Sequence, residues 1–146
     1  MQGYIKDIDS LTVENKDFRR VLYTAKSCQL VLMALKPNED IGMETHKLDQ
    51  FFRVEAGLGE AILDGVTTKI TEGFAVVIPA DTKHNIVNTG TDMLKLYTIY
   101  SPPNHRDGVV HHTRADALKD KEHFDGKTTE MGNSGSRVLP EKHPAA

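Results

Sequence analysis

A run of short segments between Phe18 and Pro102, each closed by a turn, limits most strongly what this chain can fold into. Each segment is about 5–9 residues long and is rich in β-branched and aromatic residues. None has the length or the 3.6-residue period of an amphipathic helix. Segments of this kind that recur about every ten residues predict an all-β sandwich or barrel. They read FRRVLYTA, CQLVLMALK, QFFRVEAG, GEAILDG, TTKITEG, FAVVIPA, HNIVNTG and MLKLYTIYS.

The pattern changes after the last of these segments. Thr113 can cap a helix, and Asp116 stands three residues later as an imperfect capping box, so the sequence predicts one short helix over 113–124. The residues beyond it are polar, contain Gly, Ser and Pro, and lack periodicity, which predicts a tail on the same domain. We therefore expect residues 1–112 to form the barrel with its N-terminal strand or strands, and residues 113–146 to form the helix and the tail.

The length and charge of the chain exclude several classes of function. A chain of 146 residues is sufficient for one domain with a buried core. Its net charge of -3 and its pI near 6.1 give no reason to expect a nucleic-acid partner or an anionic membrane. No apolar run approaches the roughly 18 residues of a membrane span, and no signal peptide is evident, so a cytoplasmic protein is expected. The lone Cys28 excludes internal disulfides, and its apolar surroundings predict a small buried core residue.

Two motifs resemble those of the cupin family, whose members form a double-stranded β-helix, or jelly-roll, barrel. The first family motif has the form G-x5-H-x-H-x3-E-x6-G, and the second has the form G-x5-P-x-G-x2-H-x3-N. Both spacings are retained here, with 15 residues between the two motifs, as in the small single-domain cupins loosely grouped with mannose-6-phosphate isomerase. The matching positions are Asn38, Glu44, His46, Gln50 and Gly57 in the first motif, and Gly73, Pro79, Asp81, His84 and Asn88 in the second.

The departures from these motifs are of two kinds. Asn38 and Asp81 replace glycines, and because Asn and Asp adopt left-handed backbone more readily than other residues with a side chain, the turns are expected to remain. Glu44 replaces a histidine and Gln50 replaces a glutamate, which changes the chemistry of the site. The formal negative charge is unchanged, because Glu44 supplies the carboxylate that Gln50 lacks.

The resemblance implies a metal site formed by Glu44, His46, Gln50 and His84. Residues two apart in a strand share a face, so Glu44 and His46 are expected to point the same way. Gln50 would join them from the next strand, and His84 from across the barrel. Two histidines and a carboxylate suit a divalent first-row ion (Fe, Mn, Ni, Co or Zn), whereas an amide oxygen is a weak neutral ligand. The alternative is a vestigial pocket that holds no metal.

The leading hypothesis for function is a metal-dependent enzyme that acts on a small oxygen-rich metabolite, by isomerisation of a sugar or sugar phosphate or by other Lewis-acid chemistry. Glu44 is the candidate catalytic base if it is not bound to the metal. Two alternatives remain, namely an Fe-type cupin dioxygenase and a non-catalytic cupin that binds a small ligand beside a degenerate or empty site. The family also implies a homodimer.

The other residues of interest receive simpler interpretations. Arg53 and Lys95 are assigned to the outer face of the barrel. The barrel interior is expected to be lined by Phe52, Val54, Ile86, Leu96 and Tyr100. Solvent-exposed surface is expected for the remaining histidines, His105, His111, His112, His123 and His143.

Overall fold

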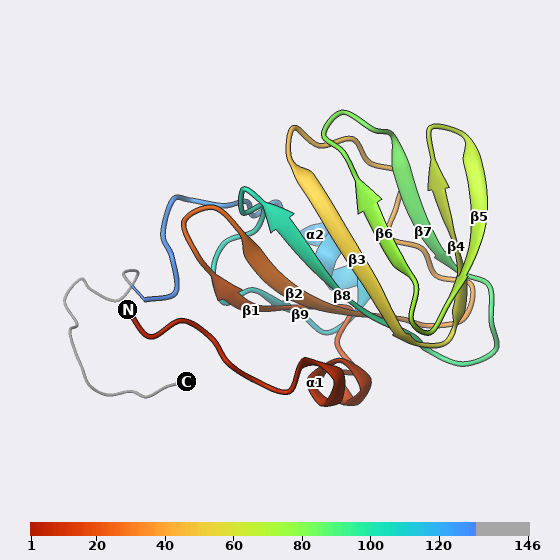
Figure 1. Cartoon of the computed structure of the whole chain (residues 1–146), viewed down its shortest axis with the longest axis horizontal. Helices are drawn as coiled ribbons and strands as arrows, with labels where there is room; N and C mark the ends of the chain where they lie inside the picture. The colour runs from red at the N-terminus through yellow and green to blue at the C-terminus, as the bar shows by residue number, and fades with distance from the viewer. Residues whose placement is uncertain (131–146) are drawn as a thin grey trace.

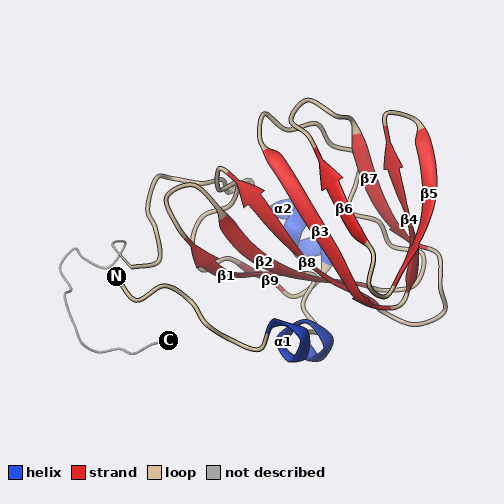
Figure 2. Ribbon diagram, viewed as in Figure 1, coloured by secondary structure: helices blue, strands red, loops and turns tan. Residues whose placement is uncertain are grey.

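Two antiparallel β-sheets face each other in the computed structural model, which describes residues 1–130 (Figure 1, Figure 2). The larger sheet has six strands in the order β6-β3-β8-β2-β1-β9, and the smaller has three in the order β5-β4-β7. The expected all-β jelly-roll barrel with a short C-terminal helix is confirmed. The elements are α1 (Ile8–Glu14), β1 (Arg19–Thr24), β2 (Gln29–Leu35), β3 (Asp49–Ala56), β4 (Leu58–Leu63), β5 (Val66–Thr71), β6 (Ala75–Ile78), β7 (His84–Asn88), β8 (Leu94–Ser101), β9 (Val110–His111) and α2 (Arg114–Lys119).

Strands β1 to β8 correspond one by one to the segments that the sequence predicts. Turn chemistry agrees as well, because Asn38 and Asp81 have φ angles of 73° and 70° and so keep the left-handed backbone of the glycines that they replace. The two-residue strand β9 was not expected. It pairs with β1 at the edge of the larger sheet and places His111 opposite Arg19.

The hydrophobic core lies between the two sheets. Along β3 the buried Gln50, Phe52 and Val54 alternate with residues that are more exposed, as a strand with one inward face requires. The expected interior residues are all buried, with exposed fractions of 2% or less for Phe52, Val54, Ile86, Leu96 and Tyr100. The same interior face therefore carries both the apolar core and the polar residues of the candidate site.

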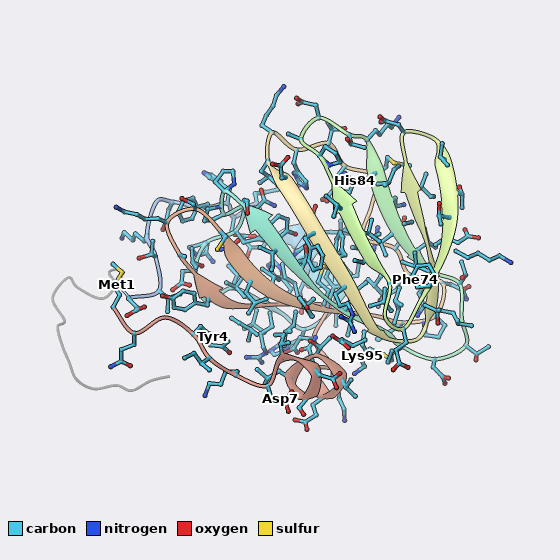
Figure 3. All side chains as sticks on the ribbon, in the orientation of Figure 1. Met1, Tyr4, Asp7, Phe74, His84 and Lys95 are labelled. Atoms are coloured by element: carbon cyan, nitrogen blue, oxygen red, sulfur yellow. The ribbon has the colours of Figure 1, made fainter. Side chains whose placement is uncertain are left out.

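Helix α1 is an addition that the strand pattern did not predict. Asp7 caps its first turn by accepting a hydrogen bond from the backbone N–H of Ser10. The helix packs outside the larger sheet, against β8, β3 and β2 (Figure 1). Lys95 is on the outer face as expected, but its Nζ donates to the carbonyls of Val13 and Asn15 at the end of the helix, beside which Figure 3 places it. Burial under the helix lowers the pKa of Lys95.

Helix α2 begins as predicted and ends earlier. Thr113 accepts a hydrogen bond from the backbone N–H of Asp116, and the Asp116 carboxylate accepts one from Thr113, which completes the capping box. The helix ends at Lys119 rather than at 124, because Asp120 has extended backbone and the carboxylates of Asp120 and Glu122 bond to buried histidines. Among residues 1–130, no helix has both the length and the apolar composition needed to cross a bilayer.

The prediction for Cys28 was wrong, because its side chain is exposed. Its apolar neighbours belong to β2, which begins one residue later at Gln29, whereas Cys28 itself closes the β1–β2 turn. The backbone N–H of Ala25 donates to the Cys28 carbonyl at 2.9 Å across that turn.

Candidate metal centre

Glu44 and His84 meet because their backbones pair. The segment that connects β2 to β3 runs beside the start of β7, and the backbone N–H of each residue donates to the carbonyl of the other at 2.8 Å. The carbonyl of His46 accepts a hydrogen bond from the Asp81 N–H at 2.7 Å, which fixes the segment at a second point. His84 therefore lies on a neighbouring segment, and the expectation that it faces Glu44 from across the barrel was wrong.

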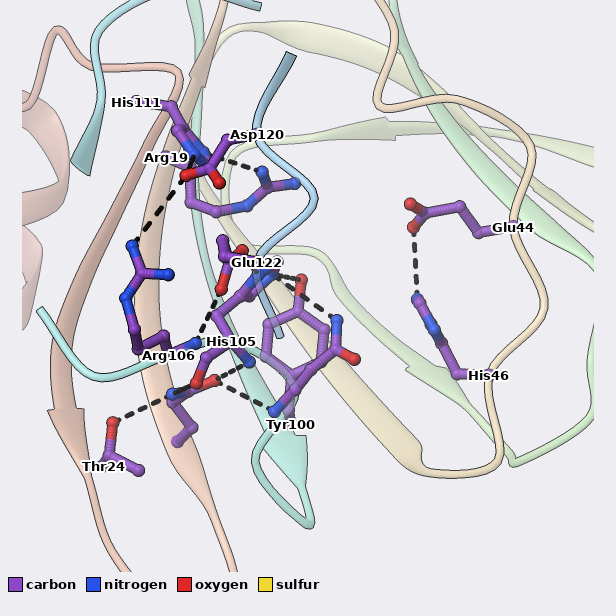
Figure 4. A network of polar contacts seen from close by, with 12 residues as sticks. Arg19, Thr24, Glu44, His46, Tyr100, His105, Arg106, His111, Asp120 and Glu122 are labelled. Atoms are coloured by element: carbon purple, nitrogen blue, oxygen red, sulfur yellow. Dashed lines mark hydrogen bonds and ion pairs between the residues drawn. The ribbon is translucent and has the colours of Figure 1, made fainter. Parts of the chain in front are cut away.

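Three of the predicted ligands converge on one point. Glu44, His46 and His84 each offer a ligand atom within 4.8 Å of the others. His46 Nε2 lies 3.2 Å from Glu44 Oε1, and the two imidazole rings are 5.3 Å apart (Figure 4 shows the Glu44–His46 pair). Burial alone would raise the pKa of Glu44, but the hydrogen bond with His46 and the charge of Arg19 hold it below its ordinary value. Glu44 is therefore an ionised carboxylate at neutral pH.

His84 has a nitrogen that is prepared to bind a metal. Its Nδ1 lies 2.9 Å from the carbonyl of Thr82, which can only accept, so Nδ1 carries the proton of the neutral ring. Nε2 is then a lone pair, and it is buried without a hydrogen-bond partner among the described residues. A backbone carbonyl that holds one imidazole nitrogen and leaves the other free is the usual support for a metal-bound histidine.

Gln50 presents a second buried acceptor without a partner. Its side chain is 3% exposed, and its Nε2 donates to Thr98 Oγ1 at 3.0 Å. Its Oε1 has no hydrogen-bond partner in the part of the chain that the structure describes. Buried polar atoms are rarely left unpaired, so an unpaired amide oxygen calls for a ligand. The role of Gln50 as a fourth metal ligand stays a prediction.

A cluster of buried polar residues lies beside this site, and the sequence pattern missed it. His105 was expected at the surface, but it is 7% exposed. Both ring nitrogens have buried partners, since Nδ1 donates to Glu122 at 2.6 Å and Nε2 lies 3.3 Å from the hydroxyl of Tyr100 (Figure 4). The Tyr100 ring in turn meets the His46 ring edge-on at 6.2 Å. Burial raises the pKa of Tyr100 to about 12, which keeps its hydroxyl protonated.

Gln29 holds the loop that carries His105. The side chain is fully buried, and its Nε2 donates to Thr24 Oγ1 at 2.9 Å and to the His105 carbonyl at 2.7 Å. Its Oε1 accepts from the backbone N–H groups of Asn104 and His105 at 3.1 and 2.9 Å. One glutamine thus satisfies three backbone groups of a loop that forms no strand of its own.

His111 was also expected at the surface and is 4% exposed. Its Nε2 lies 3.1 Å from the Asp120 carboxylate, and its Nδ1 lies 3.1 Å from Arg19 Nη1. The expectation of an exposed histidine is correct for His112 and His123. His143 lies outside the described residues.

A cavity of about 240 Å³ opens beside the Glu44 carboxylate. Glu44 and Arg19 belong to its walls, and the stretch from Asn104 to His123 supplies most of the remainder, with His105, Arg114 and Glu122 among its lining residues. The cavity is large enough for a ligand of metabolite size. The candidate metal centre therefore adjoins a space that a small molecule can occupy.

We expect the stability of the metal-free protein to fall as the pH drops below about 6.5. Burial lowers the pKa of His105, so the folded state favours the neutral ring, and the resulting stabilisation is present above the unfolded pKa and lost below it. The pKa of Glu122 is also below its ordinary value, since the bond from His105 outweighs burial, so its contribution is lost at still lower pH. Urea unfolding between pH 7.5 and 4.5 measures this. His105→Gln should flatten the profile near pH 6, whereas a change at the exposed His123 should not; equal profiles would contradict the assignment.

Comparison with known proteins agrees with this architecture. Residues 31–100 match the family model Cupin_2, described as a cupin domain. The chain is 43% identical over 122 residues to the uncharacterized protein YrkC of Bacillus subtilis (strain 168), an alignment that spans 79% of this chain and 66%, just under two thirds, of YrkC.

Two further relatives are covered more completely. An uncharacterized protein of Acanthamoeba polyphaga mimivirus is 41% identical over 142 residues, which covers 94% of this chain and 80% of that protein. The crystal structure of BH2720 from Bacillus halodurans is 40% identical, has a TM-score of 0.80, and aligns with 82% of this chain and 96% of its own.

Proposed function

Since this chain belongs to the cupin family, and since its barrel carries a cluster of metal-ligating side chains, we propose that it binds a divalent first-row metal ion and acts as an enzyme on a small oxygen-rich metabolite. Glu44, His46, Gln50 and His84 would hold the ion. The observation that carries the proposal is the pair of buried acceptors, His84 Nε2 and Gln50 Oε1, that have no hydrogen-bond partner among residues 1–130, the first of them close to the ionised carboxylate of Glu44.

The donor set fits an ion of this kind. Imidazole nitrogens with one carboxylate suit Fe(II), Mn(II), Ni(II), Co(II) or Zn(II), and the negative charge of Glu44 offsets part of the charge of the ion. When bound, the ion supplies Lewis-acid polarisation of a hydroxyl, keto or carboxylate oxygen of the substrate. Sugar or sugar-phosphate isomerisation is one reaction that this chemistry serves.

The chain's own residues can hold and move protons around the substrate. Glu44 is ionised and lines the cavity, so it is the candidate base at its carboxylate oxygens when it is not itself a ligand of the ion. On another wall His105 is neutral, because burial lowers its pKa, and its Nδ1 proton is held by Glu122. Tyr100 stays protonated and positions its hydroxyl against His105 Nε2.

Metal analysis of the purified protein tests the proposal most directly. About one first-row ion per chain, measured by mass spectrometry after removal of loosely bound metal, is the expected result. A protein that holds no metal after incubation with each of the five ions would contradict it, and a non-catalytic cupin that captures a small ligand would then be the better description. Dependence of turnover on Fe(II) and O2 would instead indicate a dioxygenase.

Gln50→Glu should tighten metal binding by about 10-fold, because it adds a charged oxygen donor at a buried position. The same change should destabilise the metal-free protein, since it would place a carboxylate at a buried position with no cation to compensate its charge. Competition with a chelator measures the affinity, and urea unfolding measures the stability. If affinity is unchanged while stability falls, the Gln50 side chain does not reach the metal.

Association as a homodimer is proposed from the family alone. Light scattering across micromolar to millimolar concentrations should give about twice the 16.2 kDa mass of one chain. A mass that stays near that of one chain throughout would refute the dimer.

A further inference from the structure

Arg19 is a buried cation in the wall of the cavity. It begins β1, its side chain is 8% exposed, and it lines the same space as Glu44. In Figure 4 the guanidinium of Arg19 and the carboxylate of Glu44 extend toward one another from opposite sides. An arginine keeps its charge at every physiological pH, so the guanidinium places a permanent positive charge in a cavity whose lining also includes Arg114, Asp120 and Glu122.

The charge of Arg19 is held by a neutral partner rather than by a carboxylate. A carboxylate oxygen can only accept, so His111 Nε2 donates its proton to Asp120. The other ring nitrogen, Nδ1, is then an acceptor and receives a hydrogen bond from Arg19 Nη1 at 3.1 Å. The Nε–H of Arg19 is buried and has no partner within residues 1–130. In that part of the chain no carboxylate oxygen forms an ion pair with this guanidinium, although every other arginine does so.

Arg114 shows what a paired arginine looks like in the same cavity. Its Nε donates to the Asp40 carbonyl at 2.7 Å, and its Nη2 donates to the Asp40 carboxylate at 2.9 Å. The charge of Arg114 is thus compensated within the protein. Burial of a cation without such compensation is costly, and an anion from outside that forms the missing contacts gains the corresponding free energy.

We propose that Arg19 binds the carboxylate of the substrate, and that the substrate is a small organic acid that also carries hydroxyl or keto oxygens. The planar fork of a guanidinium matches a carboxylate in two parallel hydrogen bonds, and Nε–H is one donor of such a fork. The other oxygens of the acid would then face Glu44, His46 and His84. This substrate class rests on the proposed function, whereas the anion site at Arg19 can be tested without it.

The probe pair of gluconate and sorbitol tests the inference. The two molecules have similar hydroxylated chains and differ in the carboxylate, and either fits a space of about 240 Å³. Calorimetric titration of the Zn(II)-loaded protein should show gluconate bound at least ~10-fold more tightly than sorbitol. Arg19→Gln should remove this preference and Arg19→Lys should retain part of it. Arg20→Gln, which alters the next residue along β1, paired with Asp17 away from the cavity, should leave it unchanged.

A second arm separates this inference from the metal proposal. In metal-free protein the carboxylate of Glu44 competes with an added anion for Arg19, so Glu44→Gln should allow gluconate to bind without metal, and the added Arg19→Gln change should abolish that binding. If the wild type takes up no metal but this arm behaves as expected, the metal proposal fails and the anion site stands. If gluconate and sorbitol bind alike, or if Arg19→Gln changes neither arm in a protein whose circular dichroism is native, the inference is overturned.

Discussion

Replacing His84 with alanine is expected to leave the protein without metal, lowering the metal content from about one ion per chain to background and the affinity by more than ~100-fold. The Nε2 atom is buried and has no hydrogen-bond partner among residues 1–130, so its removal deletes a ligand that no nearby side chain in the described structure can replace. Changes to groups that merely orient a ligand already cost 10–100-fold, and loss of the ligand itself should cost more. Metal analysis and chelator competition measure both quantities.

The matched control for His84→Ala is His112→Ala, because His112 is an exposed histidine whose side chain contacts the Asp17 carboxylate, away from the site. Its metal content should equal that of the wild type. Glu44→Gln gives an independent test, since it leaves the site with no carboxylate, and it too should lose metal. Retention of full metal content and affinity by both His84→Ala and Glu44→Gln would mean that this cluster is not the metal site.

Replacing Gln29 with leucine is expected to destabilise the protein by about 3–5 kcal/mol. The side chain is fully buried and makes four hydrogen bonds, so leucine would leave the backbone N–H groups of Asn104 and His105 and the His105 carbonyl without partners. Each buried polar group left in that state costs about 1–3 kcal/mol. Urea unfolding of metal-free protein measures the change in the free energy of unfolding.

Gln50→Leu is the matched control for this prediction. Gln50 is also a buried glutamine of the larger sheet, but among the described residues its side chain bonds to the side chains of Thr98 and Tyr100 and to no loop backbone, so its replacement should cost less, about 1–2 kcal/mol. Equal losses for the two variants would show that burial, not the loop contacts of Gln29, decides the stability. His105 should also lose its position in Gln29→Leu, which is visible as a shift of its ring resonances.

Local patterns in the sequence were sufficient to predict most of the fold. Strand-length segments with turn residues between them predicted β1 to β8, and Asn38 and Asp81 kept their turns because their side chains tolerate left-handed backbone. Helix α2 was predicted from Thr113 and Asp116. Helix α1 was not, although Asp7 as a cap with Asp9 in the first turn was a signal, because its β-branched residues resembled a strand.

The burial of His105 and His111 could not be predicted from the sequence. His105 and His111 are buried because the chain returns after α2 and places Glu122 and Asp120 against them, contacts that no local pattern encodes. Residues 120–124 were instead expected to form the end of the helix. Nothing in the sequence indicated that Arg19 is buried. Arg19 and Arg20 are adjacent arginines in one strand, and only the pairing of β1 with β9 shows that the side chain of Arg19 is the inward one.

The two walls of the cavity come from separate stretches of the chain. The candidate metal ligands lie within residues 44–84, whereas most of the opposite wall belongs to residues 104–123, where Leu118 is 59% exposed at its margin. Because these stretches do not overlap, a mutational library confined to the second can vary ligand preference while the donor atoms stay constant. The protein is therefore a practical scaffold for engineering, because selection for a new substrate can change residues 104–123 while the candidate metal ligands stay unchanged.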